Sequence, residues 1–132
     1  MQVKVLIVDD DDYMVRLYRR LFEYEDFVVF VAQDGQAAIE LVNELQPNLI
    51  MLDIMMPVMN GLEALEILKG AKLTKEIPIV MLTNLNDAAN IEKAKALGAD
   101  DYLLKSNFEG DYIMGVVRKY IPSPAPLPLI GR

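Results

Sequence analysis

Five short apolar runs punctuate the chain, and each is followed by a polar or charged residue. Each run is too short for a buried helix, and several are rich in Val and Ile, which is typical of strands buried on both faces of a parallel sheet. The central run is the clearest, because Leu49 to Leu52 are all apolar and Asp53 ends them. The expected strands cover residues 3–8, 27–32, 49–53, 77–83 and 101–105.

Between these runs, apolar side chains recur every three or four residues, as they do in amphipathic helices. In the first such segment, for example, Met14, Leu17 and Leu21 share one face and Arg16 lies on the other. The expected helices run from Asp11 or Asp12 to about Tyr24, from the Asp34-Gly35 turn to Pro47, from Gly61 to about Lys69, from a cap at Asn84, Asn86 or Asp87 to Leu97 followed by Gly98, and from Asp111 to Ile121.

Strict alternation of strand and helix implies parallel βαβ units with right-handed crossovers, so that helices cover both faces of one sheet. We therefore expect an α/β fold, a doubly wound sandwich of three layers. With 132 residues and 53% hydrophobic content, the chain has room for one compact domain. We place this domain at residues 1–121.

Residues 122–132 carry Pro at every second position from Pro122 to Pro128, which predicts either a frayed tail or the start of a linker to an output domain.

Charge and composition narrow the classes of function. A net charge of −7 and the lack of a Lys/Arg-rich run argue against direct nucleic acid binding and against an anionic membrane surface. The chain has no Cys and no His, so disulfides, thiol nucleophiles and histidine acid-base chemistry are excluded. Met1 leads directly into a strand pattern without a signal peptide or a membrane-spanning run, and we expect a cytoplasmic protein.

The residues that end the strands carry the candidate chemistry. Asp9 and Asp10 follow the first strand, Asp53 ends the third, Thr83 the fourth and Lys105 the fifth. In an open α/β sheet these strand ends meet at one edge, where ligands bind. Three carboxylates in a small site repel one another unless a cation neutralises them, and oxygen ligands without His or Cys favour Mg²⁺.

A metal, a lysine and a hydroxyl around one carboxylate suit the acceptance of a phosphoryl group. Asp53 would be the nucleophile, Mg²⁺ and Lys105 would balance the charge of the phosphoryl oxygens, and Thr83 would donate a hydrogen bond to them. Phosphorylation adds roughly −1.5 to −2 charge and three acceptor oxygens, so the product can act as a switch.

Four motifs in this order resemble the receiver domain of two-component response regulators. The resemblance covers Val3 to about Ile121, and it implies the flavodoxin-like fold, a five-stranded parallel sheet in the order 2-1-3-4-5 with five helices. The motifs are Val8-Asp9-Asp10-Asp11, Leu52-Asp53-Ile54-Met55-Met56-Pro57 with Gly61, Val80-Met81-Leu82-Thr83, and Gly98-Ala99-Asp100-Asp101-Tyr102-Leu103-Leu104-Lys105.

The resemblance also implies roles for single residues. Asp53 would be the phosphoacceptor and, with Asp10, a direct Mg²⁺ ligand, while Asp9 would bind through water and Met55 through its backbone carbonyl. Thr83 and Tyr102 would form the switch pair, and the signal would leave through the fourth helix, fifth strand and fifth helix. A sensor histidine kinase or a phosphotransfer protein would supply the phosphoryl group. The domain would catalyse only its own phosphorylation and dephosphorylation, and its output partner or effector domain is unknown.

Two departures from the family pattern bear on the site. Ser106 follows Lys105 where the family commonly has a proline after a cis peptide bond, and a cis bond before a non-proline residue costs about 2.5 to 4 kcal/mol. The positions two beyond Asp53 and two beyond Thr83 are Met55 and Leu85, and neither side chain can orient an attacking water. We therefore expect a slowly hydrolysed phosphate.

Several alternatives remain at this point. Asp11 and Asp12 favour simple helix capping. An aspartate-nucleophile phosphatase would usually need a second acid two residues after the first, where this chain has Met55. An interaction module that is never phosphorylated would not need the complete set of site residues. Homodimerisation on phosphorylation is a further hypothesis, based on output-face charges at Lys93, Asp100, Asp101, Arg118 and Lys119.

Overall fold

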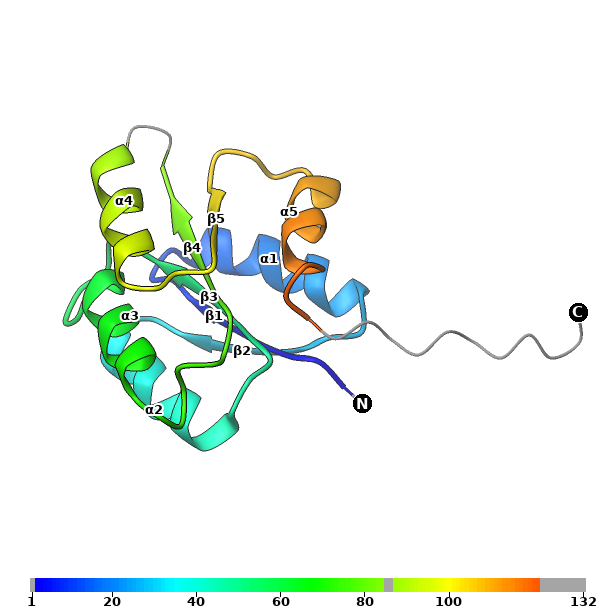
Figure 1. Ribbon diagram of the computed structural model, residues 1–132. Helices are drawn as coiled ribbons and strands as arrows, with labels where there is room; N and C mark the ends of the chain where they lie inside the picture. Colours follow the sequence, from blue (N-terminus) through cyan, green and yellow to red (C-terminus); the bar gives the residue numbers. More distant parts are fainter. Residues whose placement is uncertain (1, 85–86, 122–132) are drawn as a thin grey trace, which may run out of the picture.

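The computed structural model describes residues 2–84 and 87–121, in which five strands alternate with five helices (Figure 1). The Pro-rich segment 122–132 lies outside the described residues. The elements are β1 (Lys4–Val8), α1 (Asp12–Tyr24), β2 (Val28–Ala32), α2 (Gly35–Leu45), β3 (Leu49–Asp53), α3 (Gly61–Gly70), β4 (Ile79–Thr83), α4 (Ala88–Ala96), β5 (Asp101–Leu104) and α5 (Gly110–Val117).

The strands form one parallel sheet in the order β2-β1-β3-β4-β5. Val8 is in register with Leu52, and Asp53 with Leu82, so the carboxyl ends of the central strands lie at one edge. This confirms the expected flavodoxin-like fold, and it places the strand ends that carry the candidate site residues side by side.

Alternate residues of each central strand feed two separate apolar clusters, as the two-residue period of a strand requires. In β3, Leu49 and Met51 face the cluster under α1 and α5, whereas Ile50 and Leu52 face the cluster under α2, α3 and α4. These four side chains are fully buried, and each burial contributes about 1.5–3 kcal/mol. Figure 1 shows the corresponding layers, with α1 and α5 on one side of the sheet.

Local capping explains where several helices begin and end. Asp11 precedes α1, and its carboxylate accepts the backbone N–H groups of Tyr13 at 3.0 Å and Met14 at 3.4 Å, as the helix-capping hypothesis predicted. Asn60 and Glu63 form a capping box at the start of α3. Gly98 adopts a φ of +101° after α4, the left-handed conformation expected there.

The boundaries of β4 and α4 differ slightly from the expected ones. β4 begins at Ile79 rather than residue 77, because Pro78 has no N–H group for the ladder. Asp87 does occupy the cap position of α4, but its side chain accepts from Asn90 instead of a backbone N–H. Of the other two proposed caps, Asn84 lies three residues before this position and accepts the Asp87 N–H at its carbonyl at 3.3 Å, and Asn86 lies outside the described residues.

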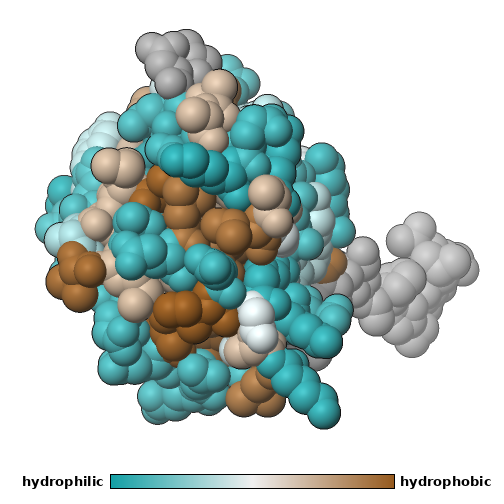
Figure 2. All heavy atoms as spheres, turned by 60° about the vertical axis from the view of Figure 1, so that its left-hand side comes forward, coloured by the Kyte–Doolittle hydropathy of each residue, from teal (hydrophilic) through white to brown (hydrophobic). Residues whose placement is uncertain are grey.

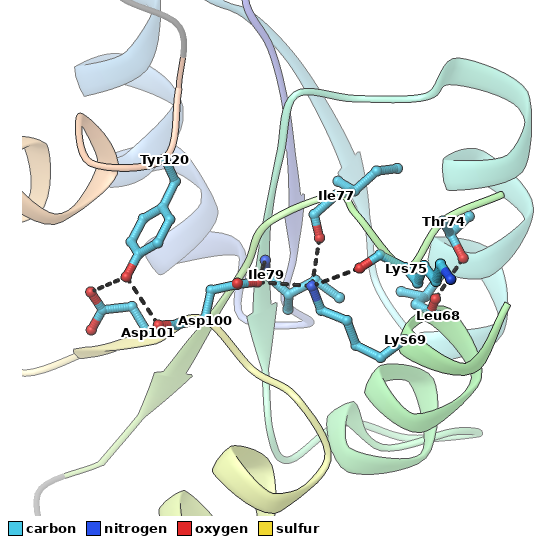
Figure 3. Close-up of polar contacts among 9 residues, drawn as sticks. All are labelled: Leu68, Lys69, Thr74, Lys75, Ile77, Ile79, Asp100, Asp101 and Tyr120. Atoms are coloured by element: carbon cyan, nitrogen blue, oxygen red, sulfur yellow. Dashed lines mark hydrogen bonds and ion pairs between the residues drawn. The ribbon is translucent and has the colours of Figure 1, made fainter. Parts of the chain in front are cut away.

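The end of α5 differs most, because the helix stops at Val117 and not at residue 121. The following turn tightens, with N–H groups that reach back only three residues, as in the bond from Tyr120 to Val117 at 3.0 Å. This turn brings the Tyr120 hydroxyl to 2.9 Å from Asp101 Oδ2 and 3.0 Å from the Asp100 carbonyl (Figure 3). The turn after α5 is therefore hydrogen-bonded to the start of β5.

Apolar side chains on the surface over α3 and α4 lie in separate patches between polar ones (Figure 2). Exposed apolar residues of α3 and its following turn include Ile67 and Leu73. Within residues 2–84 and 87–121, no helix has the length and hydropathy needed to cross a membrane.

Candidate functional site

Asp53 lies at the carboxyl end of the central strand and is only 6% exposed. The chain turns sharply after it, and the Gly61 N–H donates to the Ile54 carbonyl at 2.8 Å. A Cβ atom on Gly61 would overlap the Asp53 carbonyl oxygen, so only glycine allows this close approach. The sequence pairing of Asp53 with a later glycine is thus a geometric requirement of the loop.

The loop between β3 and α3 contains a strained residue. Val58 is β-branched and adopts a φ of +66°, in the left-handed region that such residues avoid. Next to it, the Met59 carbonyl accepts the N–H of Gly35 at 3.0 Å, which ties the loop to the start of α2. Surrounding contacts therefore hold this loop in its conformation.

Asp9 and Asp10 come to Asp53 from the end of β1. Oxygen atoms of the three carboxylates lie within 4.8 Å of one another. Asp9 is fully buried and Asp10 is exposed. Backbone contacts orient Asp9, since its N–H donates to the Ala32 carbonyl at 3.0 Å and its Oδ1 accepts the Asp11 N–H at 3.0 Å.

Lys105 lies in the loop after β5 and adds its ammonium group to this cluster. Its Nζ lies 2.9 Å from Asp9 Oδ2 and 3.4 Å from Asp53 Oδ2, and its side chain is 15% exposed. Its backbone N–H donates to the Thr83 carbonyl at 2.8 Å. No described peptide bond is cis, so the lysine that precedes Ser106 reaches the carboxylates through a trans backbone.

Burial and mutual repulsion shape the protonation of this cluster. Burial, together with the charge of Asp9, raises the pKa of Asp53 to about 7, although Lys105 acts in the opposite direction. Burial alone would lower the pKa of Lys105, but its contact with Asp9 and the charges of Asp53 and Asp9 raise that pKa above its ordinary value. The Asp53 carboxylate is thus destabilised as an anion unless more positive charge is bound nearby.

The donor set fits a divalent cation. Asp9 Oδ2 is buried and, apart from the Lys105 ammonium, has no hydrogen-bond partner among the described residues. One ammonium faces three carboxylates, which leaves negative charge uncompensated. Oxygen-only donors of this kind suit Mg²⁺.

The two switch candidates lie in different surroundings. Thr83 is buried at the end of β4, and its hydroxyl donates to the Asn84 carbonyl at 3.3 Å. Tyr102 is 38% exposed and borders a cavity of about 100 Å³ between α4 and β5. Met55 is 66% exposed at the start of the loop after β3, and Leu85 lies outside the described residues.

Two tyrosines near the site could not be identified from the residues that end the strands. Tyr18 of α1 is buried, its hydroxyl has no hydrogen-bond partner among the described residues, and burial together with the charges of Asp9 and Asp53 raises the pKa of its phenol. The Tyr112 hydroxyl of α5 accepts the N–H of Leu104, directly before Lys105. Helical periodicity marks Tyr18 only as a core position, and nothing local marks Tyr112.

Comparison with known proteins matches residues 5–117 to the family model of the response regulator receiver domain. The transcriptional regulatory protein CpxR of Escherichia coli is 40% identical over 102 residues, which cover 77% of this chain and 42% of CpxR. The DNA-binding response regulator MtrA of Mycolicibacterium smegmatis is 36% identical over 105 residues, or 80% of this chain and 45% of MtrA. The chain therefore spans less than half the length of these relatives.

Solved structures agree with these matches. Chemotaxis protein CheY4 of Vibrio cholerae superposes with a TM-score of 0.84 at 26% identity, covering 92% of this chain and 100% of the CheY4 chain. The receiver domain of the Francisella response regulator 1452 gives a TM-score of 0.80 at 31% identity, covering 90% of this chain and 96% of the other.

Proposed function

Because this chain belongs to the response regulator receiver domain family, we propose that it is a signalling switch whose phosphoacceptor is Asp53. The observation that carries the proposal is the position of the Asp53 carboxylate. It lies at the carboxyl end of β3, near Asp9 and Asp10, with the Lys105 ammonium 3.4 Å away. A nucleophile, a set of oxygen ligands and a fixed cation thus meet at one point.

In the proposed reaction an Asp53 carboxylate oxygen attacks the phosphorus of a phosphohistidine. The new P–O bond forms as the P–N bond breaks, and the departing imidazole takes up a proton. Lys105 balances negative charge on the phosphoryl oxygens. Asp9, Asp10 and Asp53, with the Met55 carbonyl, would hold Mg²⁺, which when bound supplies further positive charge there.

The relay would begin at Thr83. Its hydroxyl now donates to the adjacent Asn84 carbonyl at 3.3 Å, a long contact that a phosphoryl oxygen can replace. Withdrawal of Thr83 toward the phosphoryl group would favour inward rotation of Tyr102, whose ring borders the cavity of about 100 Å³. The face formed by α4, β5 and α5 would change shape as a result.

The partners belong to the same proposal. We assign a sensor histidine kinase or phosphotransfer protein as donor, in the cytoplasm. We assign residues 1–121 as the receiver domain and residues 122–132 as a Pro-rich tail or the start of a linker. CpxR is a transcriptional regulatory protein and MtrA a DNA-binding response regulator. By analogy with them, an effector domain that binds DNA is the output included in this proposal. Phosphorylation-dependent homodimerisation also stays a prediction. Some of its candidate charges are paired within the chain, as in the ion pair of Lys69 with Asp100 at 2.8 Å.

Intact-mass spectrometry after incubation with Mg²⁺ and a small acyl phosphate tests the proposal. The parent should gain one phosphoryl group, whereas Asp53→Asn and a chelator-treated sample should gain none. Asp12→Asn is the matched control, because Asp12 lies three residues from Asp9 but outside the acidic cluster. Equal labelling of Asp53→Asn and the parent would refute Asp53 as the acceptor.

The lifetime of the phosphate is a further test. Met55 cannot orient a water molecule, so the phosphoprotein should decay slowly, and Met55→Glu or Met55→Asn should shorten its lifetime. Decay is followed by loss of the added mass after removal of the donor. An unchanged lifetime in both variants would contradict this role of the position.

A further inference from the structure

The last strand of the sheet has an open edge. β5 pairs with β4 only, so the N–H groups that point away from β4 have no strand partner. Lys105 N–H points inward, to the Thr83 carbonyl at 2.8 Å. Since successive N–H groups of a strand point to opposite sides, those of Tyr102 and Leu104 point outward.

Side-chain oxygens accept hydrogen bonds from both outward-pointing N–H groups. Asp101 Oδ1 accepts the N–H of Tyr102 at 2.8 Å. The Tyr112 hydroxyl, from the first turn of α5, accepts the N–H of Leu104 at 3.1 Å. Tyr112 is half-buried and packs against the cluster under α1 and α5, so its ring position is set by the core.

We propose that Tyr112 is a positioning residue for Lys105, an inference that rests on the proposed function of the site. The two hydrogen bonds fix consecutive peptide units, one from Leu104 to Tyr112 and one from Lys105 to Thr83. Together they hold the backbone from which the Lys105 side chain reaches Asp9 and Asp53.

The residue after the lysine makes this support necessary. Ser106 has no ring to restrict the backbone, and the loop that follows is exposed at Phe108 and Glu109. Lys105 nevertheless keeps contacts of 2.9 Å and 3.4 Å with two carboxylates. The Tyr112 hydroxyl, on the packed face of α5, restricts the backbone at the end of β5.

The opposite end of β5 offers a matched comparison. Tyr120 also places a hydroxyl at this edge, 2.9 Å from Asp101 Oδ2 and 3.0 Å from the Asp100 carbonyl (Figure 3). It contacts the start of the strand, whereas Tyr112 contacts the end that carries Lys105. Tyr120→Phe therefore removes a hydroxyl from the same edge without touching the support of the lysine.

The test is a double-mutant cycle on the initial rate of phosphorylation by a small acyl phosphate with Mg²⁺. Tyr112→Phe should slow the reaction about three- to ten-fold, the range that one net hydrogen bond represents. In a Lys105→Met background the same change should have no effect, because the residue through which Tyr112 acts is gone. Tyr112→Leu, a second variant without the hydroxyl, should slow phosphorylation in the same way. Tyr120→Phe should keep the parent rate.

Two measurements do not depend on phosphorylation. Hydrogen exchange at the Leu104 amide should accelerate in Tyr112→Phe but not in Tyr120→Phe. The NMR signal of the Lys105 ammonium nitrogen should shift toward that of a free lysine in Tyr112→Phe only. An unchanged rate and ammonium signal in Tyr112→Phe, or the same slowing in the Lys105→Met background, would overturn the positioning role. A parent that accepts no phosphoryl group would instead refute the proposed function, and the ammonium signal would still decide whether Tyr112 orders the lysine.

Discussion

Asp53 lies where its own negative charge is unfavourable. Its pKa of about 7 is above the ordinary value of 3.8, because burial and Asp9 outweigh the attraction of Lys105. A carboxyl with a raised pKa in the folded state binds more protons than it does in the unfolded state. Its contribution to stability is therefore complete below about pH 4 and is lost as the pH rises through about 7.

Asp53→Asn should consequently stabilise the metal-free protein at pH 8. We expect the free energy of unfolding to rise by about 1–3 kcal/mol, because the amide removes a buried charge. Near pH 4 the difference should vanish, since the parent carboxyl is then protonated in the folded state. Urea denaturation in the presence of a chelator at both pH values measures this, and a larger gain at pH 4 than at pH 8 would contradict it.

Val58 is a second residue at which the structure predicts a gain. Its φ of +66° costs roughly 1–2 kcal/mol for a residue with a Cβ atom. Val58→Asn should therefore raise the free energy of unfolding by about 1 kcal/mol, because Asn tolerates the left-handed region. Val58→Ile keeps the branched Cβ and is the control, and a comparable gain in that variant would show that strain is not the cause.

Single residues also mark how far sequence reasoning reaches. The meeting of Asp9, Asp53 and Lys105 follows from parallel strands that end at one edge, and the structure places all three together. The contact of Tyr112 with Leu104 depends on how α5 lies across the edge of the sheet. No local pattern encodes that placement, which explains why the sequence did not reveal it.

At the scale of elements, α1 depends on the cap at its start. Asp11→Ala removes the oxygen that accepts the N–H groups of Tyr13 and Met14, and it should lower the free energy of unfolding by about 0.5–2 kcal/mol. Asp12→Asn, one residue later, makes no such contact and should change it by less than about 0.5 kcal/mol. Urea denaturation of both variants decides, and equal losses would point to charge rather than capping.

Element boundaries were predictable where a side chain acts locally and not elsewhere. Asp11, Pro47 and Gly98 act through their own backbone neighbourhood, and the elements begin or end close to them as expected. The early end of α5 has another cause. It accompanies the contact of Tyr120 with Asp101, 19 residues away in the chain, which helical periodicity does not contain.

For the whole molecule, we expect the stability of the fold to depend on the concentration of divalent cations, through the acidic cluster of Asp9, Asp10 and Asp53. Mg²⁺ that binds only the folded state should stabilise it by about 2.7 kcal/mol at a hundred times its dissociation constant. Thermal unfolding with Mg²⁺, against sodium chloride of equal ionic strength, measures the gain. Asp10→Asn, at an exposed position, should remove most of it, and a full gain in that variant would exclude Asp10 as a ligand.

The global arrangement was predictable because few topologies satisfy an alternating strand and helix pattern. Right-handed crossovers and helices on both faces restrict the sheet, and the resemblance to receiver domains supplied the strand order that the structure has. Packing detail across the layers was beyond such reasoning, since it depends on which side chains of distant elements meet.

The site draws its groups from opposite ends of the chain, with Asp9 contributed by β1 and Lys105 by the loop after β5. During synthesis, a ribosome-bound polypeptide that has exposed only its first half would carry Asp9, Asp10 and Asp53 but not their ammonium. Such a nascent chain should be unable to take a signal. Phosphorylation of Asp53 would become possible only after nearly all of the domain has left the exit tunnel. Incomplete chains would therefore not signal.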